Sequence, residues 1–576
     1  MKLNKYILLC ISLALVLILG IACDSGIKID DMEKDIKDIT TSGQAPVEGG
    51  EVVLPLTNFG TLNPLLTDNF YYYQFSKLIF EGLFEFDKDL DVVPKLADTY
   101  SIYDNGKTIS VRLKDNIKWH DGKEVTSKDV EFTISAIKYE GKNGTYGKAF
   151  ESMLGAGGIS NINRVVNTKI IDDKNIEIYF DKEYSNNLET LTFPIIPRHR
   201  FYDGSESKAY RNALDDKDYI PVGTGPYKFV SYEKFKTVSL EKNKNYWNGT
   251  PYIDRVIGRV LEDEELILTA FETGQINFTS TIGIDWDKYK QNNRIKVLEY
   301  ISSSYEFLGF NFNNNILGGE KGSDIRKAIN YGIDRQAIIQ KVALGHGTQI
   351  DVPIHPNSYL VSNIGNTYGY NVEKAKMILT DAGFRDSDGD GILEDEQGNR
   401  LSFKLVTNSY NIYRLRMAEM ISEYLKELGI EIRMDLDTSF KENISEKMKL
   451  EQWEAINAKI KKGDFDIALL GWETSITPDL FSMFHSSQIN GGNFIRIKSE
   501  EMDGLIDEIL YITNREEKVQ RYEKLQEFII DELPYVSLFF KNKGLLMDTK
   551  IAGPLDPNFF NLYNGLENCF IPEDLQ

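Results

Sequence analysis

The stretch PKLADTYSIYDNGKTISVRLKDNIKWHDGKEVTSKDV, residues 94–130, decides the fold more than any other part of the chain. Residues 110–113 alternate polar and apolar side chains, which predicts a strand with one buried face. His120-Asp121-Gly122 predicts a turn, because glycine readily takes a positive φ. Residues 127–137 carry apolar side chains at helical spacing. This segment therefore combines short strands, turns and a helix.

The second half of the chain alternates longer helices with short strands. Helices are expected at residues 324–330, 336–343, 372–382, 413–428, 502–512 and 516–532, and strands at residues 401–407, 430–436, 465–471 and 535–540. This alternation predicts an α/β lobe with a mixed sheet. About 530 residues follow residue 46, too many for one core, so two or three domains are expected.

The N-terminus has the layout of a secretory signal. Residues 1–5 carry two lysines, residues 6–22 are almost entirely apolar, and Cys23 follows. Gly20-Ile21-Ala22 before Cys23 resembles the lipobox of bacterial lipoproteins, which implies cleavage there and a diacylglycerol on the Cys23 sulfur. Gly20 stands where that motif prefers leucine, and a retained N-terminal anchor is the alternative. Residues 23–46 are polar and predict a disordered tether.

Charge and residue usage exclude several classes of function. The formal net charge of −22 disfavours nucleic acid and anionic lipid headgroups as partners. Beyond Cys10 and Cys23 only Cys569 remains, so no disulfide framework is expected and Cys569 is interpreted as inert. The chain has no zinc-protease histidine spacing, no G-x-S-x-G elbow and no phosphate-binding loop. We therefore expect a protein that is not an enzyme.

One acidic loop resembles a calcium site. Asp386, Asp388 and Asp390 alternate with small residues and precede Gly391, as oxygen ligands do in a calcium loop. The twelfth position is Gln397, so the bidentate glutamate of that loop is missing. Two readings stay open: a structural calcium site, or an Asp-rich turn without metal. No other cofactor is expected.

Several strings, in order, resemble the family 5 extracellular solute-binding proteins, which serve oligopeptide, dipeptide and nickel importers. Residues 94–130 match the family pattern at almost every defining place. The later strings are GTGPY at 223–227, NKNYW at 243–247, GQIN at 274–277, FNFN at 310–313, IRKAINYGIDR at 325–335, DFDI at 464–467, GW at 471–472 and GN at 492–493. Together they span nearly the whole chain after the tether.

The resemblance implies an α/β, two-lobed periplasmic-binding-protein-like fold, with a ligand buried between hinged lobes. The expected division is 1–22 signal peptide, 23–46 tether, 47–82 with 220–300 and 540–576 discontinuous lobe I, 83–219 smaller inserted domain, and 301–539 lobe II. Hinge crossings are expected near residues 300–310 and 539–543. The implied role is that of a monomeric lipoprotein on the outer face of the cytoplasmic membrane, which delivers its ligand to the permease of an ABC importer.

The resemblance also suggests ligand-binding residues. In peptide-binding members an aspartate three residues after the Gly-Trp tryptophan holds the peptide ammonium; Ser475 stands there and cannot form that ion pair. Trp472 is interpreted as a pocket wall, and Glu473 or Asp479 as a substitute carboxylate.

Further candidates and alternative ligands complete the prediction. Tyr71, Tyr72 and Asn493 are additional candidates for ligand contact. The alternatives to a peptide are another small solute, such as a metal chelate, a sugar or an opine-like compound. A signalling or adhesion lipoprotein with the same fold is the remaining alternative.

Overall fold

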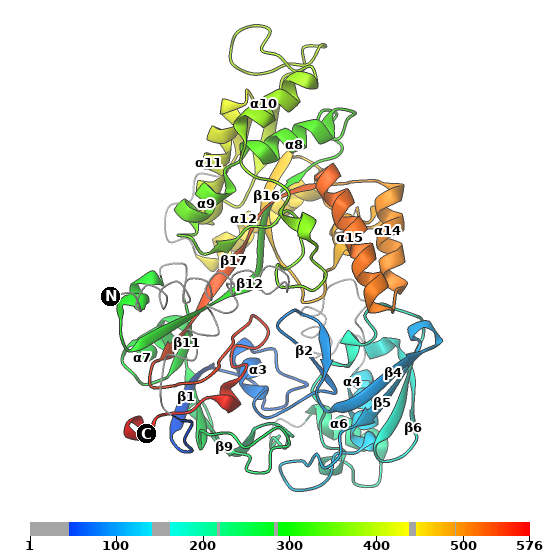
Figure 1. Cartoon of the computed structure of the whole chain (residues 1–576), viewed down its shortest axis with the longest axis vertical. Helices are drawn as coiled ribbons and strands as arrows, with labels where there is room; N and C mark the ends of the chain where they lie inside the picture. The colour runs from blue at the N-terminus through cyan, green and yellow to red at the C-terminus, as the bar shows by residue number, and fades with distance from the viewer. Residues whose placement is uncertain (1–44, 141–161, 216–218, 282–285, 437–444, 490) are drawn as a thin grey trace, which may run out of the picture.

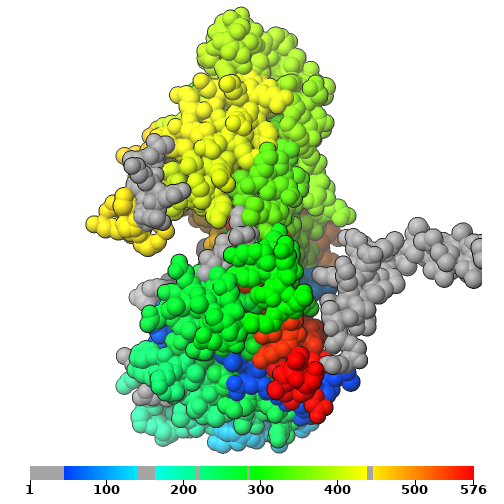
Figure 2. All heavy atoms as spheres, turned by 90° about the vertical axis from the view of Figure 1, so that its left-hand side faces the viewer, coloured from blue at the N-terminus to red at the C-terminus, as the bar shows by residue number. Residues whose placement is uncertain are grey.

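Two lobes are joined by a pair of long strands. The computed structural model describes residues 45–140, 162–215, 219–281, 286–436, 445–489 and 491–576, so the predicted signal, Cys23 and most of the tether lie outside it. Strands β12 (Ile295–Phe310) and β17 (Tyr535–Asp548) run antiparallel from the lower lobe into the upper one (Figure 1). Figure 2 shows the two masses from the side, with the C-terminal residues on the lower one.

The lower lobe contains two four-stranded sheets and a short hairpin. One sheet has the order β1 (Glu51–Thr57), β10 (Arg255–Leu261), β9 (Thr237–Lys242), β8 (Tyr227–Glu233). The other has the order β4 (Ala97–Tyr103), β5 (Thr108–Leu113), β7 (Asn175–Phe180), β6 (Val165–Ile170). The hairpin joins β2 (Phe84–Phe86) to β3 (Val92–Pro94). Helices of this lobe are α3 (Phe70–Ser76), α4 (Ser127–Glu140), α6 (Glu206–Asp215) and α7 (Glu264–Glu272).

The predictions for residues 94–130 are confirmed. Strand β5 contains the alternating residues 110–113, and α4 covers the helical pattern from residue 127. Gly122 has a φ of 88° in the turn that starts at His120. The spacing of apolar residues was sufficient here, because the strand and the helix each bury one apolar face.

The upper lobe is built on a mixed seven-stranded sheet. Its order is β11 (Phe278–Ser280), β17, β12, β16 (Ile467–Glu473), β14 (Ser402–Val406), β15 (Glu431–Asp435), with β13 (Gly347–Thr348) paired to β17. Strand β14 is parallel to β15 and β16, whereas β12 is antiparallel to β16. The sheet continues through the predicted boundaries at residues 300 and 540, because β11, β12 and β17 extend it into the lower lobe.

Helices cover both faces of this sheet. They are α8 (Gly322–Gly332), α9 (Arg335–Val342), α10 (Val372–Asp381), α11 (Ile412–Glu427), α12 (Glu446–Lys462), α13 (Leu480–Phe484), α14 (Glu500–Tyr511) and α15 (Arg515–Glu532). Leu308 of β12 belongs to the core formed with α8–α11, and Phe307 to the core formed with α12–α15. Alternate residues of one strand thus enter two cores, as expected of a sheet buried on both faces. The predicted α/β class is confirmed.

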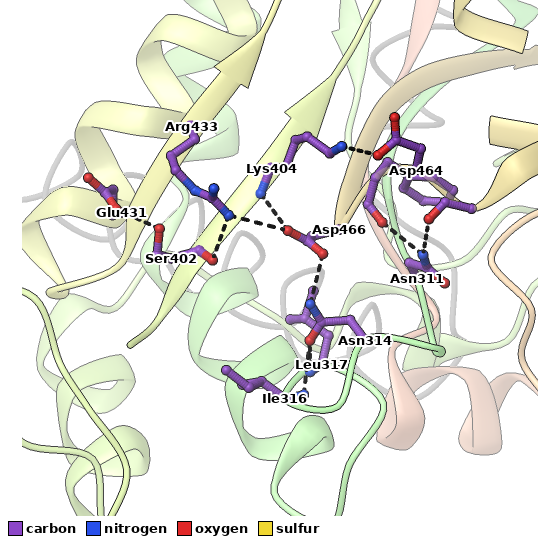
Figure 3. A network of polar contacts seen from close by, with 12 residues as sticks. Asn311, Asn314, Ile316, Leu317, Ser402, Lys404, Glu431, Arg433, Asp464 and Asp466 are labelled. Carbon is purple, nitrogen blue, oxygen red and sulfur yellow. Dashed lines mark hydrogen bonds and ion pairs between the residues drawn. The ribbon is translucent and has the colours of Figure 1, made fainter. Parts of the chain in front are cut away.

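A polar network secures the end of the central strands (Figure 3). The Asp466 carboxylate accepts hydrogen bonds from Lys404 N at 2.7 Å and Asn314 Nδ2 at 2.8 Å. Asn311 Nδ2 donates to Phe465 O at 2.7 Å. Residues 310–313 and 464–467 are therefore hydrogen-bonded to each other, and their polar side chains stabilise the fold of the upper lobe.

The two connecting strands are irregular where they pass between the lobes. Their register shifts between the pairs Ile301/Asn542 and Tyr305/Phe540, and Ser302 Oγ donates to Lys541 O at 2.7 Å within the irregular stretch. A β-bulge bends and twists a strand locally. The irregularity lies inside the predicted hinge, residues 300–310 and 539–543, and hinge motion there stays a prediction. Among the described residues, no helix is both long and apolar enough to cross a membrane.

Candidate ligand-binding site

A cavity of about 400 Å³ lies where the lobes meet. Its lower wall comes from the end of α3, from β2 and from the segment 556–567, and Ile476 enters it from the loop after β16. Cavities of this size hold small solutes. Its lining includes five acidic side chains (Glu81, Glu85, Asp87, Asp556, Glu567) and three basic ones (Lys77, Lys88, Lys95). The charge balance favours a positive group of a ligand.

Apolar side chains of the two lobes pack against each other beside this cavity. Ile476 of the upper lobe packs in one cluster with Leu90 and Phe560 of the lower lobe, and all three are at least nine-tenths buried. Leu90 lies in the turn of the β2–β3 hairpin with a φ of 57°. The cavity is therefore bounded by a contact between the lobes.

Glu81 is the buried carboxylate of the cavity wall. It accepts hydrogen bonds from Thr224 Oγ1 at 2.8 Å, Tyr246 OH at 2.7 Å and Trp247 Nε1 at 3.0 Å. Burial raises the pKa of Glu81, and the nearby Lys95 ammonium, at 3.8 Å, opposes that shift. Glu81 is thus held in place by three neutral donors and lies beside one ammonium group.

Glycine permits this arrangement. A Cβ at Gly223 would lie 1.8 Å from Ile79 O, so only glycine allows the GTGPY string to pack against residues 78–79. Gly225 N then donates to Ile79 O at 2.9 Å. The close packing of Gly223 and Gly225 against residues 78–79 places the Thr224 hydroxyl within hydrogen-bond distance of Glu81.

A buried ion pair makes a second contact between the lobes. Lys518 Nζ of α15 lies 2.9 Å from Glu189 Oε1 and 3.1 Å from Asn186 Oδ1 of the lower lobe, and donates to Ser185 O at 3.3 Å. The two charged side chains are 6% and 8% exposed. Burial by itself lowers the pKa of Lys518, but Glu189 outweighs that effect and the pKa is raised. Next to this pair, Ser185 N donates to Leu510 O at 2.9 Å.

Comparison with known proteins identifies the fold and the kind of site. The family model described as bacterial extracellular solute-binding proteins, family 5 Middle, matches residues 91–493. The chain belongs to this family. Oligopeptide-binding protein AppA of Bacillus subtilis is 29% identical over 559 residues, 96% of each protein. The AppA structure in complex with a nonapeptide superposes with a TM-score of 0.57 and 26% identity, covering 92% of this chain and 100% of that one. Heme-binding protein A of Haemophilus influenzae is 25% identical over 493 residues, 82% of this chain and 83% of that protein.

This solute-binding protein therefore has the two lobes that the sequence predicted. Family membership makes it a binding protein of an extracellular family. The cavity where the lobes meet is the candidate site for its solute.

Three predicted ligand residues lie near the cavity without lining it. Trp472 is half-buried, and its ring packs against Phe307 and Phe494 with centroid distances of 6.1 Å. Ser475 Oγ donates to Thr477 O at 2.5 Å. Glu473 is exposed and accepts hydrogen bonds from the Ser303 and Ser304 hydroxyls. Their contact with ligand stays a prediction, and Ile476, adjacent to Ser475, is the residue of this segment that lines the described cavity.

Two of the remaining candidate residues, Tyr72 and Asn493, are fully buried in this structure. Tyr72 has no exposed surface; its hydroxyl donates to Leu62 O, and its ring stacks on Phe59 at 4.7 Å. Asn493 is also fully buried, and its Nδ2 donates to the carbonyl oxygens of Phe484, His485 and Ile497. Neither side chain has surface to offer a ligand, so both serve the cores.

The tyrosines on either side of Tyr72 differ from it. Tyr71 is half-buried with its hydroxyl 3.5 Å from Glu264 Oε1; burial chiefly, and Glu264 next, raise its pKa. Its role in binding stays a prediction. Tyr73, which the sequence prediction passed over, lines the cavity beside Lys77, whose Nζ lies 4.8 Å from the Tyr73 ring centroid. Successive residues of a helix point to different sides, so a row of aromatics serves both core and cavity.

The acidic loop differs from its prediction in one ligand. Asp386 and Asp388 lie together as predicted, but their partner is Glu394. Asp390 is not part of this group: it forms an ion pair with Arg400 and accepts a hydrogen bond from Ile392 N at 2.9 Å. Asp390 is thus engaged by Arg400, and its role as a metal ligand stays a prediction.

Proposed function

We propose that this protein captures peptides between its lobes outside the cytoplasmic membrane and delivers them to the permease of an ABC importer. The observation that carries the proposal is the cavity of about 400 Å³, lined by the lower lobe and capped by Ile476 of the upper lobe. The similarity to oligopeptide-binding protein AppA over 96% of both chains supports a peptide as the solute.

The edge of β2 suits peptide binding by strand addition. Residues 84–86 line the cavity, and among the described strands β2 pairs with β3 alone. An extended peptide can add to a free strand edge through its main chain, which makes recognition tolerant of side-chain identity. The acidic excess of the cavity lining complements the ammonium of a peptide N-terminus. This replaces the ion pair that Ser475 cannot form.

A non-peptide solute is the second candidate. The Ser475 hydroxyl is engaged with Thr477 O, so the upper lobe offers no carboxylate at the predicted ammonium position. A relative that is 25% identical over 493 residues is named for heme binding. The same lobes thus suit a solute without an ammonium, such as a metal chelate, a sugar or an opine-like compound.

A thermal-shift screen separates these candidates. A ligand at 100 times its Kd stabilises the folded state by about 2.7 kcal/mol, which is visible as a rise in Tm. Pools of defined di- to nonapeptides are compared with pools of metal chelates, sugars and opines. Stabilisation by peptides supports the proposal. Stabilisation by a non-peptide pool alone would replace it with the second candidate.

The membrane location follows from the same proposal. A diacylglycerol on Cys23 would hold the protein at the outer face of the membrane, with residues 23–46 as the tether between the lipid and the folded lobes. We propose that it acts there as a monomer. The layout of residues 1–23 supports the anchor.

A further inference from the structure

The loop between α10 and β14 gathers carboxylates at the far end of the upper lobe, away from the cavity (Figure 1). One carboxylate oxygen from each of Asp386, Asp388 and Glu394 lies within 4.8 Å of the others. Asp386 and Asp388 are exposed, whereas Glu394 is only 6% exposed. Two carboxylates at the surface thus meet a third that is buried.

Glu394 has an oxygen that the protein leaves without a partner. Its Oε2 accepts hydrogen bonds from Ser387 N at 2.9 Å and Ser387 Oγ at 2.6 Å. Its Oε1 is buried and has no hydrogen-bond partner among the described residues. Two backbone bonds between Arg385 and Glu394, of 2.9 and 2.8 Å, hold the residue in this place. A buried carboxylate oxygen without a partner is costly, and it requires a compensating group.

The loop backbone orients the two exposed aspartates. Asp386 Oδ1 accepts from Gly389 N at 2.7 Å, and Asp386 Oδ2 accepts from Gly391 N at 3.0 Å. Asp388 Oδ1 accepts from Asp390 N at 3.1 Å. Each ionised carboxylate oxygen keeps lone-pair sites beyond these bonds. The aspartates are therefore held in place while they still have capacity for a cation.

We propose that Asp386, Asp388 and Glu394 bind one Ca²⁺. Calcium accepts carboxylate oxygens at about 2.3–2.6 Å in flexible geometry, whereas magnesium requires a near-ideal octahedron at about 2.0–2.1 Å and gives up its waters reluctantly, so a loop of three carboxylates favours calcium. The three oxygens lie within 4.8 Å of one another, so small side-chain adjustments bring all three onto one ion. Water and backbone oxygens complete the shell of six to eight ligands. The ion ties the end of α10 to the start of β14 and takes no part in solute binding.

Calcium titration of the full chain tests the proposal. The protein is stripped with EGTA, dialysed into about 0.15 M NaCl so that weak surface binding is screened, and titrated calorimetrically with CaCl2. We expect one saturable site with a Kd of about 10⁻⁴–10⁻³ M, as in extracellular calcium modules. Magnesium should bind at least about tenfold more weakly, because it requires a near-octahedral shell and gives up its waters reluctantly.

Three variants separate the site from the charge of the loop. Glu394→Gln and Asp388→Asn should each weaken calcium binding at least tenfold, because each replaces a charged carboxylate ligand by a neutral amide, whose oxygen binds the ion more weakly. Asp390→Asn removes the same charge from the same loop and should change the Kd by less than twofold, since Asp390 pairs with Arg400. Because Asp388 is exposed, Asp388→Asn tests the site even where Glu394→Gln disturbs folding. The absence of a saturable site in the wild type, or an Asp390→Asn loss as large as that of Asp388→Asn, would overturn the proposal.

Discussion

Replacing Lys518 by methionine should weaken ligand binding far more than it weakens the fold. Lys518 and Glu189 belong to different lobes, and each is more than nine-tenths buried when the lobes are in contact. In Lys518→Met, the closed form retains a buried Glu189 carboxylate without its cation. An open form would return that carboxylate to water, so the penalty falls on closure.

The size of this effect follows from the burial. Removing one partner of a buried ion pair costs about 3–5 kcal/mol, because the other charge is left uncompensated. Asn186 remains near the site but only as a neutral side chain, so we take about 3 kcal/mol as the loss to the closed state. Since each 1.4 kcal/mol is a factor of ten, the apparent Kd should rise roughly 100-fold.

Calorimetric titration with a peptide found in the thermal-shift screen measures this Kd. The double variant Lys518→Met/Glu189→Gln removes both charges and should recover most of the affinity, because no buried charge remains. Lys524→Met changes an exposed lysine of the same helix and serves as the matched control, with an unchanged Kd. An unchanged Kd in Lys518→Met, together with a loss of unfolding free energy of about 3 kcal/mol, would refute the reasoning and assign the pair to folding alone.

Three other residues give independent predictions. Burial lowers the pKa of His355 to about 4, whereas the pKa in the unfolded chain is about 6.5. Between these two values the unfolded chain binds a proton that the native state excludes. Lowering the pH from about 7 to about 5 should therefore remove about 2 kcal/mol of stability through this residue. Urea unfolding of His355→Gln should show that much less pH dependence, and an equal dependence would count against this cause. Asn493→Ala should lower the unfolding free energy by about 2–4 kcal/mol, because buried carbonyls lose their donor. Ligand affinity should stay the same. A loss of affinity without a loss of stability would instead place Asn493 in the binding site. Cys23→Ser should move the protein from the membrane to the soluble fraction and abolish lipid labelling, whereas retention in the membrane would indicate an uncleaved N-terminal anchor.

The spacing of apolar residues predicted the helices and strands that bury one regular apolar face. It missed one helix that lacks such a face. Helix α12 is 17 residues long, but its buried residues are Gln452, Ile456 and Ile460, too few for an apolar stripe. Its boundaries do carry signals: Ser445 accepts from Met448 N as the N-cap, and Gly463 ends the helix with a φ of 73°. Capping residues would have located the helix that hydrophobic spacing did not.

The site was less predictable because it depends on contacts between distant segments. Nothing near Lys518 or Glu189 in the sequence indicates that they meet, since 329 residues separate them. Glu81 had a detectable signal, a single charge inside the apolar run 78–83. Asp390 fitted the calcium spacing, but Arg400 binds it instead, which spacing within the loop cannot reveal.

Closure of the lobes on a peptide is the central claim, and the distance between the lobes tests it most directly. Spin labels are placed at Val166→Cys in β6 and Met377→Cys in α10, both 56% exposed, in a chain carrying Cys10→Ser and Cys23→Ser. Cys569 is buried, and burial raises the pKa of its thiol to about 12, so it should not react with the label. Pulsed electron paramagnetic resonance should show a shift to one shorter, narrower distance on addition of the stabilising peptide. A distance distribution unchanged by every peptide, or one that shortens only with a non-peptide solute, would contradict the account.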